Sequence, residues 1–131
     1  MDTALIRKLD LWWSRIVRYR YASDGGFCQC YTCSVVDSVI RMDNGHFIDR
    51  AYLGYRFDEN NCRVQCRKCN RLLSGNIERY EILLRHDLGD DLIEDMLASK
   101  SKPLEWDDKE AKAMITKWRA ECRLLRNQKR F

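Results

Sequence analysis

A chain of 131 residues, 45% of them hydrophobic, has the length and apolar content of one ordinary domain with a modest core. No apolar run is long enough to cross a bilayer, and the start of the chain lacks a signal-peptide pattern, so we expect a cytoplasmic protein without a membrane partner. The net charge of +4 is spread unevenly, because residues 1–20 and 111–131 are basic whereas residues 76–110 are acidic. The basic ends favour a polyanion such as DNA as partner. The alternative is that these charges only solvate helix faces.

The first predicted element is a basic helix within residues 1–22. Over residues 3–20, apolar side chains recur at a spacing that places them on one face of a helix, and five basic side chains lie among or beside them. We expect the adjacent Trp12 and Trp13 to belong to a core or an interface rather than to a surface on which bases stack. The apolar face consists of Leu5, Leu9, Trp12, Trp13, Ile16 and Val17.

Two Cys-x2-Cys pairs follow, Cys30 with Cys33 and Cys66 with Cys69. Pairs at this spacing can present four thiolates in a tetrahedron to one structural Zn²⁺. An odd total of seven cysteines also favours metal ligands and buried thiols over disulfides. The three cysteines left over are Cys28, Cys62 and Cys122.

Between the cysteine pairs the pattern favours extended chain. Residues 35–40 are rich in β-branched side chains, and residues 46–48 continue the extended character, so a short two-stranded element is predicted with its pairing left open. Asn44-Gly45 is a typical hairpin-turn dipeptide. Residues 49–61 have no clear period, and we expect a structured loop over a functional site.

Several helices are predicted after the second cysteine pair. Residues 67–73 fit a short helix that ends at Gly75, a residue well suited to a left-handed C-cap. Asn76 and Asp90 are candidate N-caps for a helical pair over residues 76–100.

The last predicted element is a basic helix within residues 104–131. Pro103 marks a linker before it. Asp107, followed three residues later by Glu110, forms a capping box that opens the helix. We expect the whole chain to form a single domain.

One histidine and two asparagines suggest hydrolytic chemistry. Cleavage of a phosphodiester needs a base for the attacking water and a cation for the phosphate and the departing 3′ oxygen. His46 is the candidate base, and its second ring nitrogen must be held by an oxygen acceptor. Asn70 follows a cysteine directly and offers a neutral oxygen to Mg²⁺, while Asn61 is expected to orient the loop through hydrogen bonds to the backbone. Candidates for binding DNA phosphates, if they are not only surface charges, are Arg50, Arg56 and Arg71.

The order of these residues resembles a known nuclease family. Besides the cysteine pairs, the motifs are Asp43-x-Gly45-His46-Phe47, Arg56-Phe57-x-Glu59-x-Asn61, Gln65-Cys66-x2-Cys69-Asn70 and Ser74-Gly75-Asn76-x3-Tyr80. Over about residues 30–89 the chain is similar to the HNH (ββα-metal) endonucleases, and within them to the NinG (Rap) recombination proteins of lambdoid phages. An asparagine after the last cysteine also resembles the phage endonuclease VII resolvases.

The resemblance implies an α+β, mostly helical fold with a zinc-stapled ββα-metal (HNH) core over residues 27–75 and helices on either side. It implies metal-dependent cleavage of branched DNA, such as Holliday junctions and D-loops, in the cytoplasm of a bacterial host. The catalytic residues would be His46, Asn61 and Asn70, with one structural Zn²⁺ and a catalytic Mg²⁺ or Mn²⁺. A junction needs two cuts, so we expect a homodimer. Its interface would be the two terminal helices if one small core does not cover Trp12, Trp13 and Trp118 together; the alternative is that these helices pack on their own zinc module.

One position departs from the family pattern. Most HNH nucleases carry a metal-binding aspartate directly before the histidine, whereas this chain has Gly45 there. Asp43 is the nearest carboxylate upstream and shares a strand face with that position, unless a turn redirects it. The other candidate carboxylates are Asp49 and Glu59.

Two other functions stay open. A zinc-stabilised DNA-binding module without catalysis would account for the cysteines, but it leaves the histidine and both asparagines without a role. A sequence-specific nicking or homing HNH endonuclease would use the same site residues on a different substrate.

Overall fold

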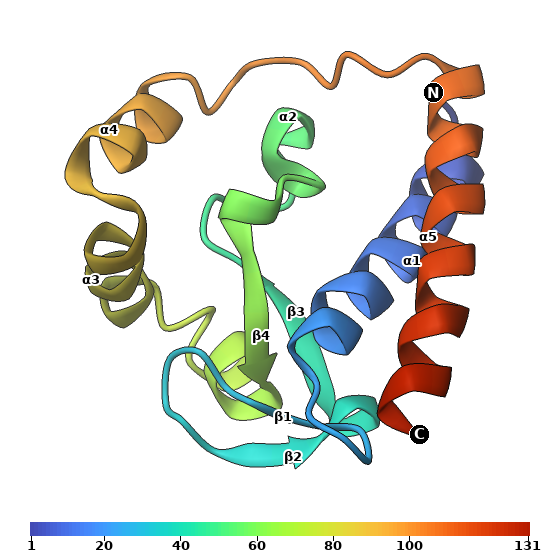
Figure 1. The fold of residues 1–131 in the computed structure, drawn as a ribbon. Coiled ribbons are helices and arrows are strands. Elements are labelled where there is room, and N and C mark those ends of the chain that lie inside the picture. Colours follow the sequence, from blue (N-terminus) through green and yellow to red (C-terminus); the bar gives the residue numbers. More distant parts are fainter.

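The computed structural model describes all 131 residues and has a mostly helical α+β architecture, as the sequence predicts. Two small antiparallel sheets, β1 with β2 and β3 with β4, lie among the helices (Figure 1). No helix is both long and apolar enough to cross a membrane. The elements are α1 (Thr3–Tyr21), β1 (Phe27–Gln29), β2 (Val36–Ser38), β3 (Met42–His46), α2 (Leu53–Arg56), β4 (Cys62–Cys66), the π-helical turn η3 (Lys68–Leu72), α3 (Ile77–Leu88), α4 (Asp90–Ala98) and α5 (Asp108–Lys129), with 3-10 turns at Val39–Arg41 and Glu59–Asn61.

The two long helices begin at side-chain caps. Asp2 accepts a hydrogen bond from the backbone nitrogen of Leu5 at 2.7 Å and opens α1. Asp107 accepts one from the backbone nitrogen of Glu110 at 2.7 Å, so the predicted start of the last helix is confirmed. Both caps satisfy amide groups that the first helical turn leaves without a partner.

The apolar side chains form two clusters on either side of the β3–β4 ribbon. The larger cluster joins α1 and α5 to the face of the ribbon that carries Met42, Cys62 and Val64. The smaller one packs α3 and α4 against the segment after β3. These clusters fix the ribbon between two helical layers (Figure 1).

The tryptophans lie within the larger cluster. Trp13 and Trp118 are 4% and 2% exposed, and their ring centroids are 5.1 Å apart. The expectation that these two side chains need a second chain to cover them is therefore wrong, because α1 and α5 cover each other. Trp12 is only partly buried at the edge of the cluster.

The β3–β4 ribbon corrects the predicted hairpin. Asn44 and Gly45 lie inside β3, opposite Val64 and Arg63 of β4, and form no turn. Glycine is required at position 45 by its neighbour, since a Cβ there would lie 2.0 Å from Oε1 of Gln65. The dipeptide thus reflects cross-strand packing rather than turn geometry.

The other extended segment also pairs differently from the prediction. Val36–Ser38 pairs with Phe27–Gln29, in a sheet separate from the one that contains His46. Residues 35–40 and 46–48 therefore do not form one two-stranded element. The partner of β3 comes from residues 62–66, beyond the structured loop.

The helices after the second cysteine pair lie close to their predicted positions. Gly75 adopts a φ of +92° after η3, which is the left-handed geometry expected of it. Asn76 precedes α3, although its side chain makes no capping hydrogen bond. The predicted cap at Asp90 is wrong by one residue, because Gly89 is the N-cap of α4. The segment around Pro103 forms the nonhelical link to α5 (Figure 1).

Candidate metal and catalytic site

The four predicted cysteine ligands come together in space. The sulfur atoms of Cys30, Cys33, Cys66 and Cys69 all lie within 4.8 Å of one another, and those of Cys33 and Cys66 are 3.6 Å apart. A tetrahedral zinc site with bonds of about 2.3 Å places its sulfurs about 3.8 Å from one another. The cluster can therefore hold a metal such as zinc.

Local backbone geometry shapes both cysteine pairs. Ser34 takes a φ of +70° directly after the first pair, and its backbone nitrogen donates to the carbonyl of Cys30 at 2.9 Å, which closes the turn that contains both cysteines. The backbone nitrogen of Cys69 donates to the sulfur of Cys66 at 3.4 Å. Gln65 links the two halves, because its amide nitrogen donates to Oγ1 of Thr32 at 3.0 Å and to the carbonyl of Gly75 at 2.8 Å.

The ionisation of the cluster also fits a cation. Partial desolvation, together with the neighbouring thiols of Cys30, Cys66 and Cys69, raises the pKa of the exposed Cys33 to about 12, and burial raises the pKa of Cys66. At Cys30, burial is outweighed by hydrogen bonds from Thr32 and nearby backbone, which lower the pKa to about 6. One thiolate thus forms readily, but four together need the positive charge of a metal ion.

The remaining cysteines are core thiols. Burial raises the pKa of Cys62 to about 12 and the pKa values of Cys28 and Cys122 to about 11. The sulfur of Cys62 also accepts a hydrogen bond from Nε1 of Trp13 at 3.3 Å. None of the three belongs to the metal cluster.

His46 ends β3 with one ring nitrogen held and the other free. Its Nε2 lies 2.9 Å from the backbone carbonyl of Arg56, which can only accept, so Nε2 carries the proton. Nδ1 has no protein partner and is left as an acceptor. Burial lowers the pKa of His46, and the charges of Arg50 and Arg56 act in the same direction. The ring is therefore neutral near pH 7, as a general base must be.

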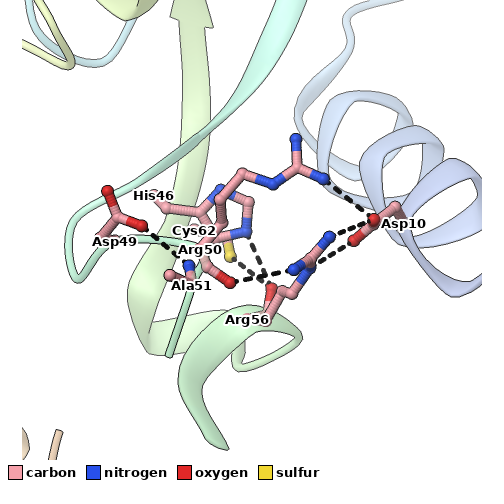
Figure 2. A network of polar contacts seen from close by, with 7 residues as sticks. All are labelled: Asp10, His46, Asp49, Arg50, Ala51, Arg56 and Cys62. Carbon is pink, nitrogen blue, oxygen red and sulfur yellow. Dashed lines mark hydrogen bonds and ion pairs between the residues drawn. The ribbon is translucent and has the colours of Figure 1, made fainter. Parts of the chain in front are cut away.

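A carboxylate on α1 binds two arginine side chains of the segment whose backbone carbonyl accepts from His46 (Figure 2). Asp10 accepts from Nε and a terminal nitrogen of Arg56 at 2.8 and 2.6 Å, and from Arg50 at 3.0 Å. Arg56 in turn donates to the backbone carbonyl of Arg50 at 3.1 Å. Sequence reasoning missed Asp10; the only signal was a lone acidic residue in the interior of a basic helix.

Asn70 and Asp43 meet on the other side of the site. Nδ2 of Asn70 donates to Oδ2 of Asp43 at 3.0 Å, which leaves the amide oxygen of Asn70 without a partner. Arg71 binds the same carboxylate with two nitrogens, at 2.9 and 3.0 Å. Because β3 contains no turn, the strand itself brings Asp43 to this place.

These residues line one pocket without a single hydrophobic side chain. It opens between α1, β3 and η3, and it brings the predicted base and the predicted oxygen ligands onto one surface. Such a surface suits a charged substrate and a hard cation rather than an apolar ligand. The lining residues are Asp10, Ser14, Asp43, Asn44, His46, Arg50, Asn70 and Arg71.

Asn61 lies beneath the site and does not line it. It is fully buried; its side-chain oxygen accepts from the backbone nitrogen of Ile48 at 2.6 Å, and its nitrogen donates to the carbonyls of Ile48 and Tyr55, each at 3.0 Å. This is the side-chain to backbone bonding that we expected of it. Asn61 therefore holds the loop in place and has no contact with the pocket.

The candidate phosphate-binding arginines differ in exposure. The side chains of Arg50 and Arg71 are each 60% exposed, whereas that of Arg56 is 15% exposed and committed to Asp10. Arg50 and Arg71 can thus reach a ligand in the pocket, and Arg56 serves the scaffold.

The two alternative carboxylates lie outside this pocket. Asp49 caps a turn by accepting from the backbone nitrogen of Ala51 at 2.8 Å, and it lines an adjacent hollow that His46 and Asn70 also line. Glu59 points to solvent beside Arg20. Asp43 is therefore the candidate carboxylate that contacts Asn70.

Comparisons with known proteins place the chain in a family. The family model described as "Bacteriophage Lambda NinG protein" matches residues 6–128. The chain is 29% identical to Protein ninG of Escherichia phage 933W, 31% to that of Salmonella phage P22 and 28% to that of Escherichia phage lambda, each over 101 residues, or 76% of the chain. It spans about half the length of these relatives, 48 to 49%. No solved structure matches it. The chain belongs to the family of the bacteriophage lambda NinG protein.

Proposed function

We propose that this chain is a metal-dependent endonuclease that cleaves branched DNA. The observation that carries the proposal is the state of His46, whose Nε2 is fixed on the carbonyl of Arg56, whose Nδ1 has no hydrogen-bond partner, and which lines one pocket with Asp43 and Asn70. A neutral, oriented imidazole next to oxygen ligands for a hard cation is what hydrolysis of a phosphodiester requires.

The cysteine cluster would hold a structural Zn²⁺. Four sulfurs fill the coordination shell of zinc, so no position stays open for a substrate or a water. Cys66 and Cys69 flank the start of η3, which carries Asn70. The ion would therefore fix the position of a proposed catalytic residue without taking part in the chemistry.

Asn70 and Asp43 would hold the catalytic ion, Mg²⁺ or Mn²⁺. The amide oxygen of Asn70 has no hydrogen-bond partner, and the amide nitrogen of the same group contacts the carboxylate of Asp43. The ion would supply positive charge to the scissile phosphate and to the departing 3′ oxygen. Arg71, which is paired with Asp43 and has a side chain that is 60% exposed, would be available to contact a phosphate if Asp43 bound the ion.

His46 would act on the attacking water. Nδ1 takes a proton as the water oxygen bonds to phosphorus, the bond from phosphorus to the 3′ oxygen breaks, and the released 3′ oxygen takes a proton from solvent. Nε2 keeps its proton and its bond to Arg56, whose carbonyl stabilises the imidazolium that forms. Asn61 would contribute by holding the loop that delivers this carbonyl, through its bond to Tyr55 next to Arg56.

Branched DNA as substrate and a homodimer as the active form follow from the HNH resemblance and from the count of sites. One chain has one His46 and so makes one cut, whereas a four-way junction needs two. Because Trp13 and Trp118 are buried within the chain, they do not mark α1 and α5 as the dimer interface.

The decisive experiment incubates the protein with labelled four-way, Y-shaped and linear DNA, with and without Mg²⁺ or Mn²⁺. We expect cuts in the branched forms only, and only with the divalent ion. Cleavage of linear DNA at one sequence would favour a nicking or homing enzyme. Binding without any cleavage would instead favour a zinc-stabilised DNA-binding module.

A further inference from the structure

A second basic surface lies between α1 and α5. We call it the α1/α5 groove. Its lining combines aromatic side chains with arginines. Its lining residues are Trp12, Arg15, Tyr19, Arg119, Cys122, Arg123, Arg126, Asn127 and Phe131.

Three arginines of this groove have no carboxylate partner. Arg15, Arg119 and Arg123 form no ion pair, although Arg20 close by is paired with Glu121 at 2.8 Å. Nε of Arg126 donates to the main-chain oxygen of Phe131, the last residue, at 3.3 Å. Three positive charges gathered in a hollow without a partner repel one another unless an anion joins them.

Trp12 holds two of these guanidinium groups in place. The guanidinium carbon of Arg15 lies 4.7 Å from the centroid of the Trp12 ring, and that of Arg119 lies 5.5 Å from it. Contacts of this kind restrict long side chains before any ligand binds, so less entropy is lost on binding. A planar guanidinium that is already oriented suits the two oxygens of a phosphate.

The groove and the polar pocket occupy opposite faces of α1. Asp10 and Ser14, four residues apart, face the pocket, whereas Trp12, Arg15 and Tyr19 face the groove. α1 lies between β3 on one side and α5 on the other (Figure 1). With its side chains a helix is about 10–12 Å across, so one stretch of backbone cannot fill both sites at once without passing around α1.

We propose that the α1/α5 groove binds the phosphate backbone of a second arm of a branched DNA, while the polar pocket takes the strand that is cut. This inference rests on the proposed function. It adds a reason for the preference for branched DNA, because only a branch offers two duplex arms that can pass on either side of one helix.

The test compares two double variants that each remove two positive charges from α5. Arg119→Ala/Arg123→Ala removes groove arginines, and Lys109→Ala/Lys117→Ala removes exposed lysines that do not line the groove. Both are made with His46→Ala, so that binding is measured without cleavage. The probes are a four-way junction and a linear duplex, each titrated over a range of salt concentrations, after equal zinc content and equal thermal midpoints have been verified.

We expect the groove variant to bind the junction ~10- to 100-fold more weakly. Its slope of log K against log salt should fall in magnitude by about 2, because each lost phosphate contact contributes about 0.9 to it. Its preference for the junction over the duplex should fall towards one. The lysine variant should keep both the slope and the preference. Equal losses in the two double variants, or an equal loss for duplex and junction, would overturn the proposal. If the wild-type protein bound the junction through the groove but never cut DNA, the proposed role of the groove would stand and the proposed nuclease activity would be rejected.

Discussion

The two ends of the β3–β4 ribbon are held by different means. At one end, Met42 pairs with Cys66 beside the four cysteines, which can be joined by a single ion. At the other end, His46 pairs with Cys62, and no metal cluster is near. Here the backbone is fixed by separate polar contacts. Asn61 bonds to the backbone, the hydroxyl of Tyr80 donates to the carbonyl of Gly45 at 2.8 Å, and Asp10 forms an ion pair with Arg56.

The two ends should lose stability in different ways when a supporting side chain is removed. A four-ligand metal site is lost as a unit, because three ligands hold the ion much more weakly and the liganded turns have little core of their own. A network of separate hydrogen bonds loses about 1–3 kcal/mol for each buried group left unpaired. We therefore expect abrupt failure at the cysteine end and graded failure at the histidine end.

The largest effect is predicted for Cys66→Ser. Structural zinc contributes on the order of 10 kcal/mol to the folding of small units, comparable to the entire stability of a domain, about 5–15 kcal/mol. We expect loss of the metal and unfolding of the ribbon. Metal analysis of the purified wild type should give about one zinc per chain, and circular dichroism against temperature should show the loss of folded structure in the variant.

Cys122→Ala is the matched control, since Cys122 is a buried thiol outside the cluster. It should keep its zinc and lose only about 1 kcal/mol, roughly the transfer free energy of one small buried group. If Cys66→Ser kept both its zinc and the wild-type melting temperature, the four-cysteine site would not be what holds this end.

The second prediction concerns catalysis at the histidine end. His46→Ala should lower the cleavage rate by about 10²–10⁴-fold, the usual contribution of a general base, while DNA binding and zinc content stay close to wild type. Cleavage of a labelled junction under single-turnover conditions measures this. His86→Ala, which removes the other histidine from an exposed position on α3, should cleave at the wild-type rate. Equal rates for all three proteins would remove His46 from the mechanism.

The same comparison shows what sequence reasoning can reach. The cysteine end was predicted because its four ligands lie in two short segments whose spacing is set by the coordination chemistry. The proposed roles of Asn70 and Asp43 rest on their nearness in the chain to those cysteines and to His46.

The histidine end was only partly predictable. Asp10 lies 36 positions before His46 and reaches the site because α1 packs against the ribbon, a contact that no local spacing encodes. The predicted turn at Asn44-Gly45 is wrong because the dipeptide lies within a strand, where the glycine leaves space for the side chain of Gln65. Cross-strand packing of this kind depends on a partner about twenty residues away and leaves no periodic signal.

Asn61→Ala should show the graded failure most clearly. It removes one acceptor and leaves the backbone groups of Ile48 and Tyr55 without partners, so we expect a loss of about 3 kcal/mol in the free energy of unfolding. Urea denaturation measures this loss. Asn60→Ala changes the neighbouring amide, whose side chain makes no hydrogen bond, and should unfold within about 0.5 kcal/mol of wild type. A loss as complete as that of Cys66→Ser would show that the two ends do not differ.

Asn70 directly follows Cys69 of the cysteine cluster and lines the pocket that contains His46. Its replacement should weaken binding of the proposed catalytic ion and leave the zinc site intact. In Asn70→Ala the free amide oxygen is gone while Asp43 stays, so we expect half-maximal cleavage at a Mg²⁺ concentration about tenfold higher, in the range seen when a single contact to a metal is lost. Titration of cleavage with Mg²⁺ measures this, and zinc content should be unchanged. Asp43→Ala tests the carboxylate by the same titration; a wild-type curve would assign the metal to Asn70, water and phosphate without it.

The smallest effect is predicted for Asp10→Asn, and it is a shift in pH dependence. His46 works as a base only when neutral, so cleavage should rise with pH through its pKa, which burial places below 6.5, and level off above it. The negative charge of Asp10 raises that pKa, whereas Arg50 and Arg56 lower it. Removing the charge should therefore move the rise to lower pH, and the looser hold on Arg56 should reduce the plateau by a few fold. Glu59→Gln removes the same charge at an exposed position outside the pocket and should leave the profile in place. A reduced plateau with an unmoved rise would mean that Asp10 acts on the fold of the loop and not on the base, whereas a moved rise would tie α1 directly to the chemistry of the histidine end.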